Sequence, residues 1–464
     1  MKNLINKKTG AVALSAIMAC AALAGCGGKD NGKLSVAIGN WPDPANEASY
    51  AAAQENETNF EKLYPDVDIV PDSYSFDSKT FNVKASGNQL PNMFNTHYTD
   101  VQQIIKAGYA LDITDKMTER GYAQAMSPDL LELVSDENGR IYGIPMQSGA
   151  YAQGLYINKE LFRQAGLENA DGSFKIPATY EELAETAKII KDKTGKAGFV
   201  MGTSSNCGGW YFMNIAWSYG VQFMEQDSDG KWTATFDTQE MYDALQLVYD
   251  MKWKYNVLPD NTVIDQAEQL KLYATNQAAM MISSPPQDSL VSKYGMNKDN
   301  AHVVSIPAGP KGKFSQMGGT VVMASTNTTE EQLDVIFDWL DFKGQGPEFT
   351  ETAESTLRSS LEAKREANNI ILPCSAFKVW VNDDRTEKEN ALYAEYTNVQ
   401  ASDYDKYFAF DGVQIKAEEP VCAQELYSVL DGVIQEIITN KDADIPALVK
   451  TAANDFQLNH LNNL

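Results

Sequence analysis

Alternating apolar residues near the start of the chain predict β-strands. Leu34, Val36 and Ile38 are spaced by two, residues 67–70 repeat this pattern, and a short apolar stretch at 92–94 follows a proline. Residues 47–65 lie between the first two stretches, are rich in Ala and Glu, and end at a proline, as a helix does. The β-α-β order predicts a parallel sheet covered by helices, which is an α/β fold.

Later helices are predicted from capping signals and apolar stripes. Thr179 with Glu182 predicts a capping box for a helix that Gly195 closes, and Thr328 with Glu331 predicts a second one. Apolar residues at i, i+3, i+4 and i+7 spacing then predict packing faces. They are Leu333, Ile336, Phe337 and Leu340, then Met241, Leu245 and Val248, and finally Leu426, Val429, Val433 and Ile437.

The first 25 residues have the pattern of a secretion signal. Lys2, Lys7 and Lys8 precede the apolar residues 11–24, a stretch shorter than the roughly 20 residues that span a bilayer. The sequence "LAGC", which ends at Cys26, resembles the lipobox of bacterial lipoproteins, although an ordinary signal peptide is the alternative. This resemblance implies cleavage before Cys26, acylation of its sulfur, a tether over 26–32, and an extracytoplasmic protein anchored to the cell membrane by lipid.

Charge and length limit the classes of function. The net charge is −25, and residues 1–25 hold three lysines and no acids, so the mature chain has −25 − 3 = −28. This charge disfavours nucleic acid and anionic lipid surfaces as partners. The mature chain is too long for one hydrophobic core and predicts two lobes. Cys207, Cys374 and Cys422 form at most one disulfide and are expected as small buried residues.

Catalytic, metal-binding and cofactor motifs are not found in the sequence. His97, His302 and His460 are not at metal-ligand spacing, and no nucleophile elbow or phosphate loop occurs. Glu225, Asp227 and Asp229 resemble the start of a calcium loop, but a β-hairpin turning at Asp229–Gly230 is preferred. With 63 acids, a carboxylate pair for glycosidase chemistry remains open.

Seven stretches in order resemble the family 1 extracellular solute-binding proteins. The clearest is "GRIYGIPMQSGAYAQGLYINKELFRQAGLE" at 139–168, and others are "FEKLYPDVDIV", "IPATYEELAETAKII" and "SIPAGPKGKFSQMGGTVVMAS". The resemblance implies a monomeric, non-enzymatic receptor that delivers solute to the permease subunits of an ABC importer. It also implies two lobes, each a mainly parallel sheet with flanking helices, at 33–144 with 317–346 and at 145–316 with 347–464, and a ligand cleft between them.

Candidate ligand contacts lie where predicted strands end. Aromatic rings suit the CH faces of a sugar, and amides or carboxylates suit its hydroxyl groups. The candidates are Asn40, Trp41, Asp43, Asn95, His97, Gln147, Tyr151, Trp210, Tyr211, Gly318 and Gly319. Trp217, Trp253, Trp339 and Trp380 are assigned to packing. Pro285 and Pro286 stand where many sugar-binding relatives carry a stacking tryptophan.

The sequence therefore predicts a carbohydrate receptor, and we expect an oligosaccharide as its solute. A lipid-anchored glycosidase and a receptor for a non-sugar solute are the alternatives. An anionic solute would need Lys or Arg in the strand-end loops named above, and those loops contain none.

Overall fold

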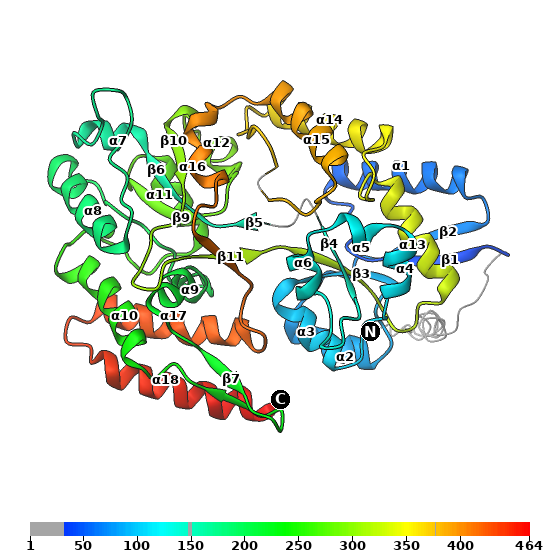
Figure 1. Ribbon diagram of the computed structural model, residues 1–464, viewed down its shortest axis with the longest axis horizontal. Coiled ribbons are helices and arrows are strands. Elements are labelled where there is room, and N and C mark those ends of the chain that lie inside the picture. Colours follow the sequence, from blue (N-terminus) through cyan, green and yellow to red (C-terminus); the bar gives the residue numbers. More distant parts are fainter. Residues whose placement is uncertain (1–31, 147–150, 376) are drawn as a thin grey trace, which may run out of the picture. The chain divides into compact units, whose positions relative to one another are not determined.

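The computed structural model describes residues 32–146, 151–375 and 377–464 (Figure 1). Cys26, the tether and Gln147 therefore lie outside the described residues. Across the described part of the chain, no helix combines the length and the apolar character needed to cross a membrane. The described residues fold into two compact units, one within 32–94 and 327–336 and the other within 95–326 and 337–464. These units are not the predicted lobes, 33–144 with 317–346 and 145–316 with 347–464, which stay a prediction.

The smaller unit confirms the predicted β-α-β order. Its elements are β1 (Leu34–Ile38), α1 (Glu47–Leu63), β2 (Val67–Pro71), α2 (Ser78–Ser86) and the start of β3 (Met93–His97). Strand β1 pairs in parallel with β2 along its whole length, and Ile38 pairs in parallel with Met93 of β3. The side chain of Asn92 accepts a hydrogen bond from the amide of Ala37 at 2.8 Å and so fixes the entry to β3.

Helix α13 (Glu330–Phe342) begins one residue later than predicted. Its capping box is Thr329 with Gln332: the Thr329 hydroxyl accepts the Gln332 amide at 3.2 Å, and Gln332 Oε1 accepts the Thr329 amide at 3.0 Å. The predicted pair of Thr328 and Glu331 is wrong because the Thr328 hydroxyl donates instead to the Asn92 carbonyl at 3.2 Å. The four apolar residues predicted for this helix are all buried, as expected.

The larger unit contains the remaining strands in antiparallel and parallel pairings. In one sheet, β6 lies between β10 and β9 and is antiparallel to both, and in another, β11 pairs in parallel with β13 and antiparallel with β5. The sheets of this unit are therefore mixed rather than mainly parallel. The strands are β4 (Gly143–Pro145), β5 (Tyr151–Ala152), β6 (Gly154–Asn158), β7 (Met224–Gln226), β8 (Trp232–Ala234), β9 (Met280–Ser283), β10 (Ala301–Val304), β11 (Lys313–Gly318), β12 (Thr320–Ala324) and β13 (Val413–Lys416).

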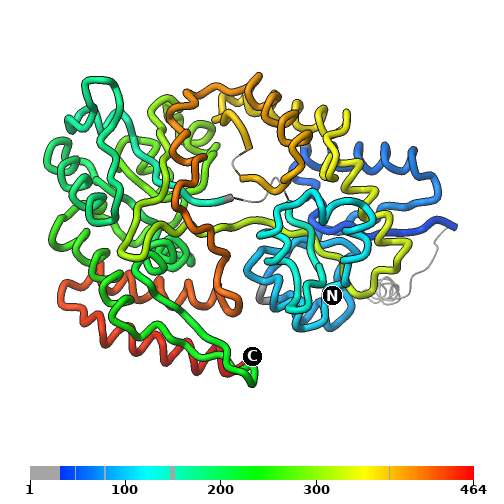
Figure 2. The backbone as a smooth tube through the Cα atoms, in the orientation of Figure 1, coloured from blue at the N-terminus to red at the C-terminus, as the bar shows by residue number. Residues whose placement is uncertain are grey.

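Helices of the larger unit cover these strands (Figure 2). Helix α9 packs against α17, α10 and β11. The longer helices are α3 (Tyr98–Lys106), α8 (Tyr180–Thr194), α9 (Cys207–Tyr219), α10 (Gln239–Trp253), α11 (Gln266–Ala274), α14 (Glu351–Glu366), α15 (Asp383–Tyr396), α17 (Ala423–Thr439) and α18 (Ile445–Asn459). Shorter ones are α4 (Thr114–Glu119), α5 (Tyr122–Ala125), α6 (Pro128–Leu133), α7 (Lys159–Gln164), α12 (Ser289–Ser292) and α16 (Asp405–Phe408).

Local predictions in the larger unit are confirmed. The Thr179 hydroxyl accepts the Glu182 amide at 3.1 Å, and Gly195 ends α8 with φ of 72°, a left-handed conformation that favours glycine. Strands β7 and β8 form the hairpin expected around Asp229–Gly230. Cys207, Cys374 and Cys422 are free thiols, but each is only partly buried, which corrects the expectation that they are buried residues.

Candidate functional site

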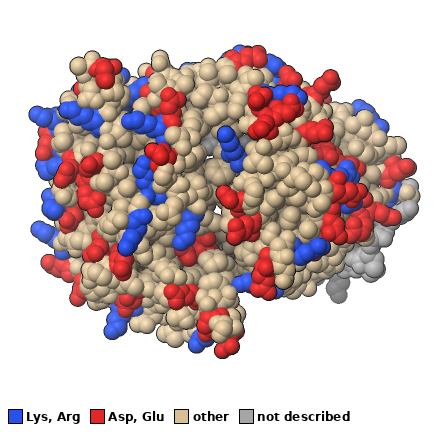
Figure 3. All heavy atoms as spheres, in the orientation of Figure 1, with Lys and Arg blue, Asp and Glu red and all other residues tan. Residues whose placement is uncertain are grey.

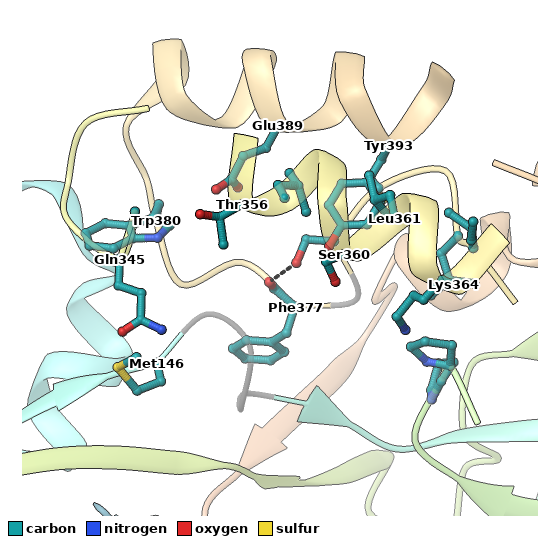
Figure 4. A pocket seen from close by; sticks show the side chains of 18 of the residues that line it. Met146, Gln345, Thr356, Ser360, Leu361, Lys364, Phe377, Trp380, Glu389 and Tyr393 are labelled. Carbon is teal, nitrogen blue, oxygen red and sulfur yellow. Dashed lines mark hydrogen bonds between the residues drawn. The ribbon is translucent and has the colours of Figure 1, made fainter. Parts of the chain in front are cut away.

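A cavity of about 600 Å³ lies within the larger unit (Figure 4). Pro145 and Met146 at the end of β4, Trp210 on α9 and residues 284–287 after β9 form part of its wall. The rest of the wall comes from residues 343–393, which include α14 and α15. The volume falls in the range of small-molecule sites.

The wall of the cavity mixes aromatic and polar side chains. Figure 4 shows Thr356 and Ser360 extending from α14 and Glu389 from α15, with Phe377 facing them. Trp380 and Tyr393 add further aromatic surface. Such a lining offers rings for apolar faces of a ligand and hydroxyl or carboxyl groups for its polar atoms.

A buried ion pair supports the wall formed by α15. Arg385 and Glu389 lie one helical turn apart with an N–O distance of 2.9 Å, and their side chains are 4% and 9% exposed. The Arg385 guanidinium also donates to the carbonyls of Gly346 at 2.6 Å and Glu348 at 2.8 Å, and it lies 4.7 Å from the Trp380 ring centroid. The buried cation is therefore matched by one carboxylate and several backbone acceptors.

Trp210 reaches the cavity from the first turn of α9, and a distant helix holds that turn. Asn206, which precedes α9, makes no side-chain cap; instead, the carboxylate of Asp431 on α17 accepts the amides of Asn206 at 2.7 Å and Gly209 at 2.9 Å. A Cβ on Gly209 would lie 2.4 Å from the Cα of Tyr427, so only glycine allows this approach. The packing of α9 on α17 thus places Trp210.

Glu418 hydrogen-bonds to Trp210, and a second acidic side chain, Asp100, lies close to Glu418. The Glu418 carboxyl makes side-chain hydrogen bonds with Thr99, Trp210 and Tyr427, and the Thr99 hydroxyl also donates to Asp100 at 3.0 Å. Burial raises the pKa of Glu418 to about 7 and that of Asp100 to about 6. The hydrogen bonds lower both pKa values and so offset part of the shift. The negative charge of Asp100 raises the pKa of Glu418 further.

A chain of amide side chains continues from Glu418 into the crossing strands. Gln316 on β11 donates from Nε2 to the Tyr427 hydroxyl at 2.8 Å and lies 3.5 Å from Glu418 Oε1. The backbone N–H of Gln316 donates to Asn214 Oδ1 at 2.8 Å, and the side chain of Asn214 donates from Nδ2 to Gln153 Oε1 at 2.7 Å. These buried amides rigidly connect α9 to β11 and to the residue after β5.

Several predicted ligand residues come together in this region. Tyr151 and Gly318 are paired across β5 and β11, and His97 hydrogen-bonds to the backbone of Gly319. Neighbouring groups partly desolvate His97 and lower its pKa, although its side chain reaches the surface and this hydrogen bond opposes the shift. Asn95 lies two residues before His97 on β3 and is partly buried.

The two neighbouring aromatic candidates on α9 differ. Trp210 is half-buried and lines the cavity, whereas Tyr211 is fully buried in the core and its hydroxyl accepts a hydrogen bond from Gln266 at 3.1 Å. Their rings meet edge to face with centroids 4.8 Å apart. In this structure Tyr211 therefore supports Trp210 as a packing residue.

Asn40, Trp41 and Asp43 lie in the smaller unit. Asn40 is exposed with φ of 57°, and Trp41 is 8% exposed. Asp43 Oδ1 accepts the Ala45 amide at 2.7 Å, so this side chain forms a turn. Their role as ligand contacts remains a prediction.

The sequence missed most of the cavity wall. Trp380, assigned to packing, is 3% exposed, packs against Tyr122 and also lines the cavity. Arg385 and Glu389 lie between the stretches that resemble the family, so no motif pointed to them. Asp100 offered one usable signal, a carboxylate in the first turn of the helix that follows a strand.

The sequence is similar to those of known solute-binding proteins. The sequence profile of the family "Bacterial extracellular solute-binding protein" matches residues 41–342. The polygalacturonan/rhamnogalacturonan-binding protein YtcQ of Bacillus subtilis is 24% identical over 344 residues, which cover 69% of this chain and 67% of that protein.

Two solved structures share the fold. The acarbose receptor GacH of Streptomyces glaucescens superposes with a TM-score of 0.62 at 16% identity and covers 91% of this chain and 97% of its own. UgpB of Mycobacterium tuberculosis, solved with glycerophosphocholine, has a TM-score of 0.66 at 14% identity, with 92% and 98% coverage. At these identities the similarity concerns the fold, which is the α/β periplasmic-binding-protein fold.

Proposed function

This chain belongs to the bacterial extracellular solute-binding protein family, and from that membership we propose that it is the lipid-anchored carbohydrate receptor of an ABC importer. Members of this family are receptors of ABC importers and not enzymes. The proposed solute is an oligosaccharide, taken up at the cavity in the larger unit and passed unchanged to the permease.

The observation that carries the carbohydrate proposal is the lining of the cavity. Trp210 and Phe377 supply aromatic surface, and Thr356, Ser360 and Gln287 supply hydroxyl and amide groups beside it. A sugar ring presents CH groups on its faces and hydroxyls at its edge, which suits such a mixture. Two similar proteins support the same solute class. The Bacillus subtilis relative is named as a polygalacturonan/rhamnogalacturonan-binding protein, and the Streptomyces glaucescens receptor was solved in complex with acarbose.

Closure of two lobes around the solute is part of the proposal. We place the lobes at 33–144 with 317–346 and at 145–316 with 347–464. The chain would then cross between them near Tyr151 and Gly318, which are paired neighbours on β5 and β11. Hinges of this kind are a few residues at the ends of elements.

Calorimetry against a panel of neutral oligosaccharides tests the carbohydrate proposal. We expect saturable binding to at least one member, and recovery of that sugar with unchanged mass. Trp210→Ala is expected to weaken binding roughly tenfold or more, as loss of a central aromatic anchor does. Trp232→Ala is the matched control, because Trp232 is also half-buried against the core of the same unit but does not line the cavity.

Three results would contradict this proposal: binding of a glycerophosphodiester or peptide without any response to sugar, cleavage of the glycan, or equal affinities of Trp210→Ala and wild type.

The anchor is tested separately with Cys26→Ser. Wild-type protein is expected in the detergent phase and labelled by palmitate in cells. The variant is expected in the aqueous phase without label, and label in the variant would contradict acylation at Cys26.

A further inference from the structure

Asp100, Glu418, Thr99 and Gln316 form a compact group that we name the acid cluster. Thr99 and Asp100 come from the first turn of α3, Glu418 from the loop before α17, and Gln316 from β11. The Thr99 hydroxyl hydrogen-bonds to both carboxyl groups, which brings the two acids against one side chain. Trp210 hydrogen-bonds to Glu418 and lines the cavity, so this side chain links the cluster to the cavity, whereas none of the four residues of the cluster itself lines it.

The acid cluster holds no cation among the described residues. Neither Asp100 nor Glu418 forms an ion pair there, and the charged groups that act most on them are acids, Glu425 on Asp100 and Asp100 on Glu418. The next residue, Glu419, differs: its carboxylate accepts the Trp217 indole N–H at 3.0 Å and lies 3.6 Å from Lys416 Nζ. One acid of this loop is therefore paired with a cation, and its neighbour is left without one.

Gln316 gives a second and independent sign that a donor is missing. Its side chain is fully buried and its Nε2 contacts Glu418 Oε1, yet its own Oε1 finds no hydrogen-bond partner in the part of the chain that the structure describes. Buried amide oxygens are nearly always hydrogen-bonded. The cluster thus contains an unused acceptor beside two carboxyl groups that share the Thr99 hydroxyl.

Donors and acceptors in the acid cluster do not balance. Thr99, Tyr427 and Trp210 each have one O–H or N–H hydrogen to give, and Gln316 Nε2 gives its two to Tyr427 and Glu418, while the two carboxyl groups and Gln316 Oε1 can accept more. A protonated amine supplies three N–H donors and one positive charge, which is the composition this group lacks.

We propose that the acid cluster binds a protonated amino group of the solute, so that the receptor prefers amine-bearing carbohydrates. This inference rests on the proposed function and narrows its substrate class. The amino group would hydrogen-bond to Asp100, Glu418 and Gln316, while the sugar ring occupies the cavity beside Trp210. A neutral or anionic substituent at this position would leave the two carboxyl groups unpaired.

Matched pairs of sugars test the inference. We would titrate the full mature chain with glucosamine and galactosamine mono- to tetrasaccharides, and with their N-acetylated counterparts, by calorimetry near pH 6.5. In at least one pair the amine is expected to bind roughly tenfold or more tightly than the acetylated form, because hydrogen bonds to charged groups are the stronger ones. Glu418→Gln is expected to abolish this preference, and Glu419→Gln to keep it.

The outcomes separate the inference from the proposed function. If neutral sugars bind and no amine binds more tightly than its acetylated partner, the amine inference is overturned and the carbohydrate receptor stands. If the amine preference survives in both Glu418→Gln and Asp100→Asn, the cluster is not its source, and the inference is again overturned. If no sugar of either kind binds, the proposed function itself fails. Circular dichroism spectra would establish that each variant is folded.

Discussion

The larger unit buries acidic side chains in two different ways. Glu389 is paired with Arg385, whose guanidinium also donates to backbone carbonyls, so the charge is matched within the protein although the Arg385 Nε–H has no hydrogen-bond partner among the described residues. Asp100 and Glu418 share the Thr99 hydroxyl and, among the described residues, have no ion-pair partner. The Arg385–Glu389 pair lines the cavity, and Glu418 is connected to it through Trp210. The contrast indicates that the first supports the wall and that the second has capacity left for a ligand.

Surface charge does not explain this difference. Acidic and basic side chains are interspersed on the face shown in Figure 3, and the whole chain carries a net charge of −25. An excess of acid on the surface costs little because water and salt screen it. Burial removes that screening, so an unpaired acid inside the protein is held at a cost that a bound cation can offset.

The largest expected effect comes from breaking the matched pair. Arg385→Met would leave Glu389 buried without its cation and would free several backbone carbonyls, so we expect a loss of about 3–5 kcal/mol in the free energy of unfolding. Urea denaturation measures it. Arg358→Met is the control, since the ion pairs of Arg358 with Glu354 and Glu395 are exposed to water and are therefore expected to contribute little to stability. Equal losses in the two variants would contradict the structural role of Arg385.

A third buried carboxylate should show an intermediate effect. Within 32–146, 151–375 and 377–464, Asp431 has no ion-pair partner, but it accepts backbone amides at the start of α9. Asp431→Ala would therefore leave these N–H groups unpaired at a cost of about 1–3 kcal/mol. Because this turn carries Trp210, affinity for the sugar should also fall. Sugar titration and urea denaturation of the same variant measure both. A stability loss with unchanged affinity would show that Asp431 does not position Trp210.

The smallest expected effect is a pH dependence of stability from the unmatched pair. The pKa of Glu418 is raised from 4.5 to about 7 and that of Asp100 from 3.8 to about 6. At pH values between its ordinary and its raised pKa, each carboxyl group binds more protons in the folded state than in the unfolded state. The two groups therefore make the protein more stable as pH falls from 7.5 toward 5.

Thermal unfolding of wild type and Glu418→Gln across this range isolates the effect from that of other acids. The gain in Tm of wild type on acidification should exceed that of Glu418→Gln by about 1–3 °C. Glu419→Gln should behave like wild type. Identical profiles for wild type and Glu418→Gln would show that Glu418 ionises in its ordinary range.

Local sequence signals predicted local structure well. The alternation of Leu34, Val36 and Ile38 defined β1, and Thr179 with Gly195 defined both ends of α8. The cap of α13 was displaced by one residue because a contact distant in sequence, from Thr328 to Asn92, decided which threonine caps the helix. A pattern within one segment carries no information about such a contact.

The candidate site was less predictable for the same reason. Trp210 could be found because it follows a predicted strand, which the structure reduces to isolated bridges at Ala197 and Val200. Asp100 and Glu418 are separated by most of the chain, and only tertiary packing brings both to Thr99. The cavity wall at 343–393 lies mainly outside the stretches that resemble the family, so neither motif nor periodicity marked it. The position of Glu418, which is half-buried beside Asp100, cannot be read from residue type.

Proton release on binding tests most directly whether the unmatched acids receive a positive charge. Calorimetry near pH 6, in buffers with different ionisation enthalpies, counts the protons exchanged when an amine-bearing sugar binds. The wild-type protein is expected to release protons, because an ammonium group lowers the pKa of both carboxyl groups, and Glu418→Gln is expected to release fewer. Binding of the amine with no proton release, or with equal release in both proteins, would contradict the account.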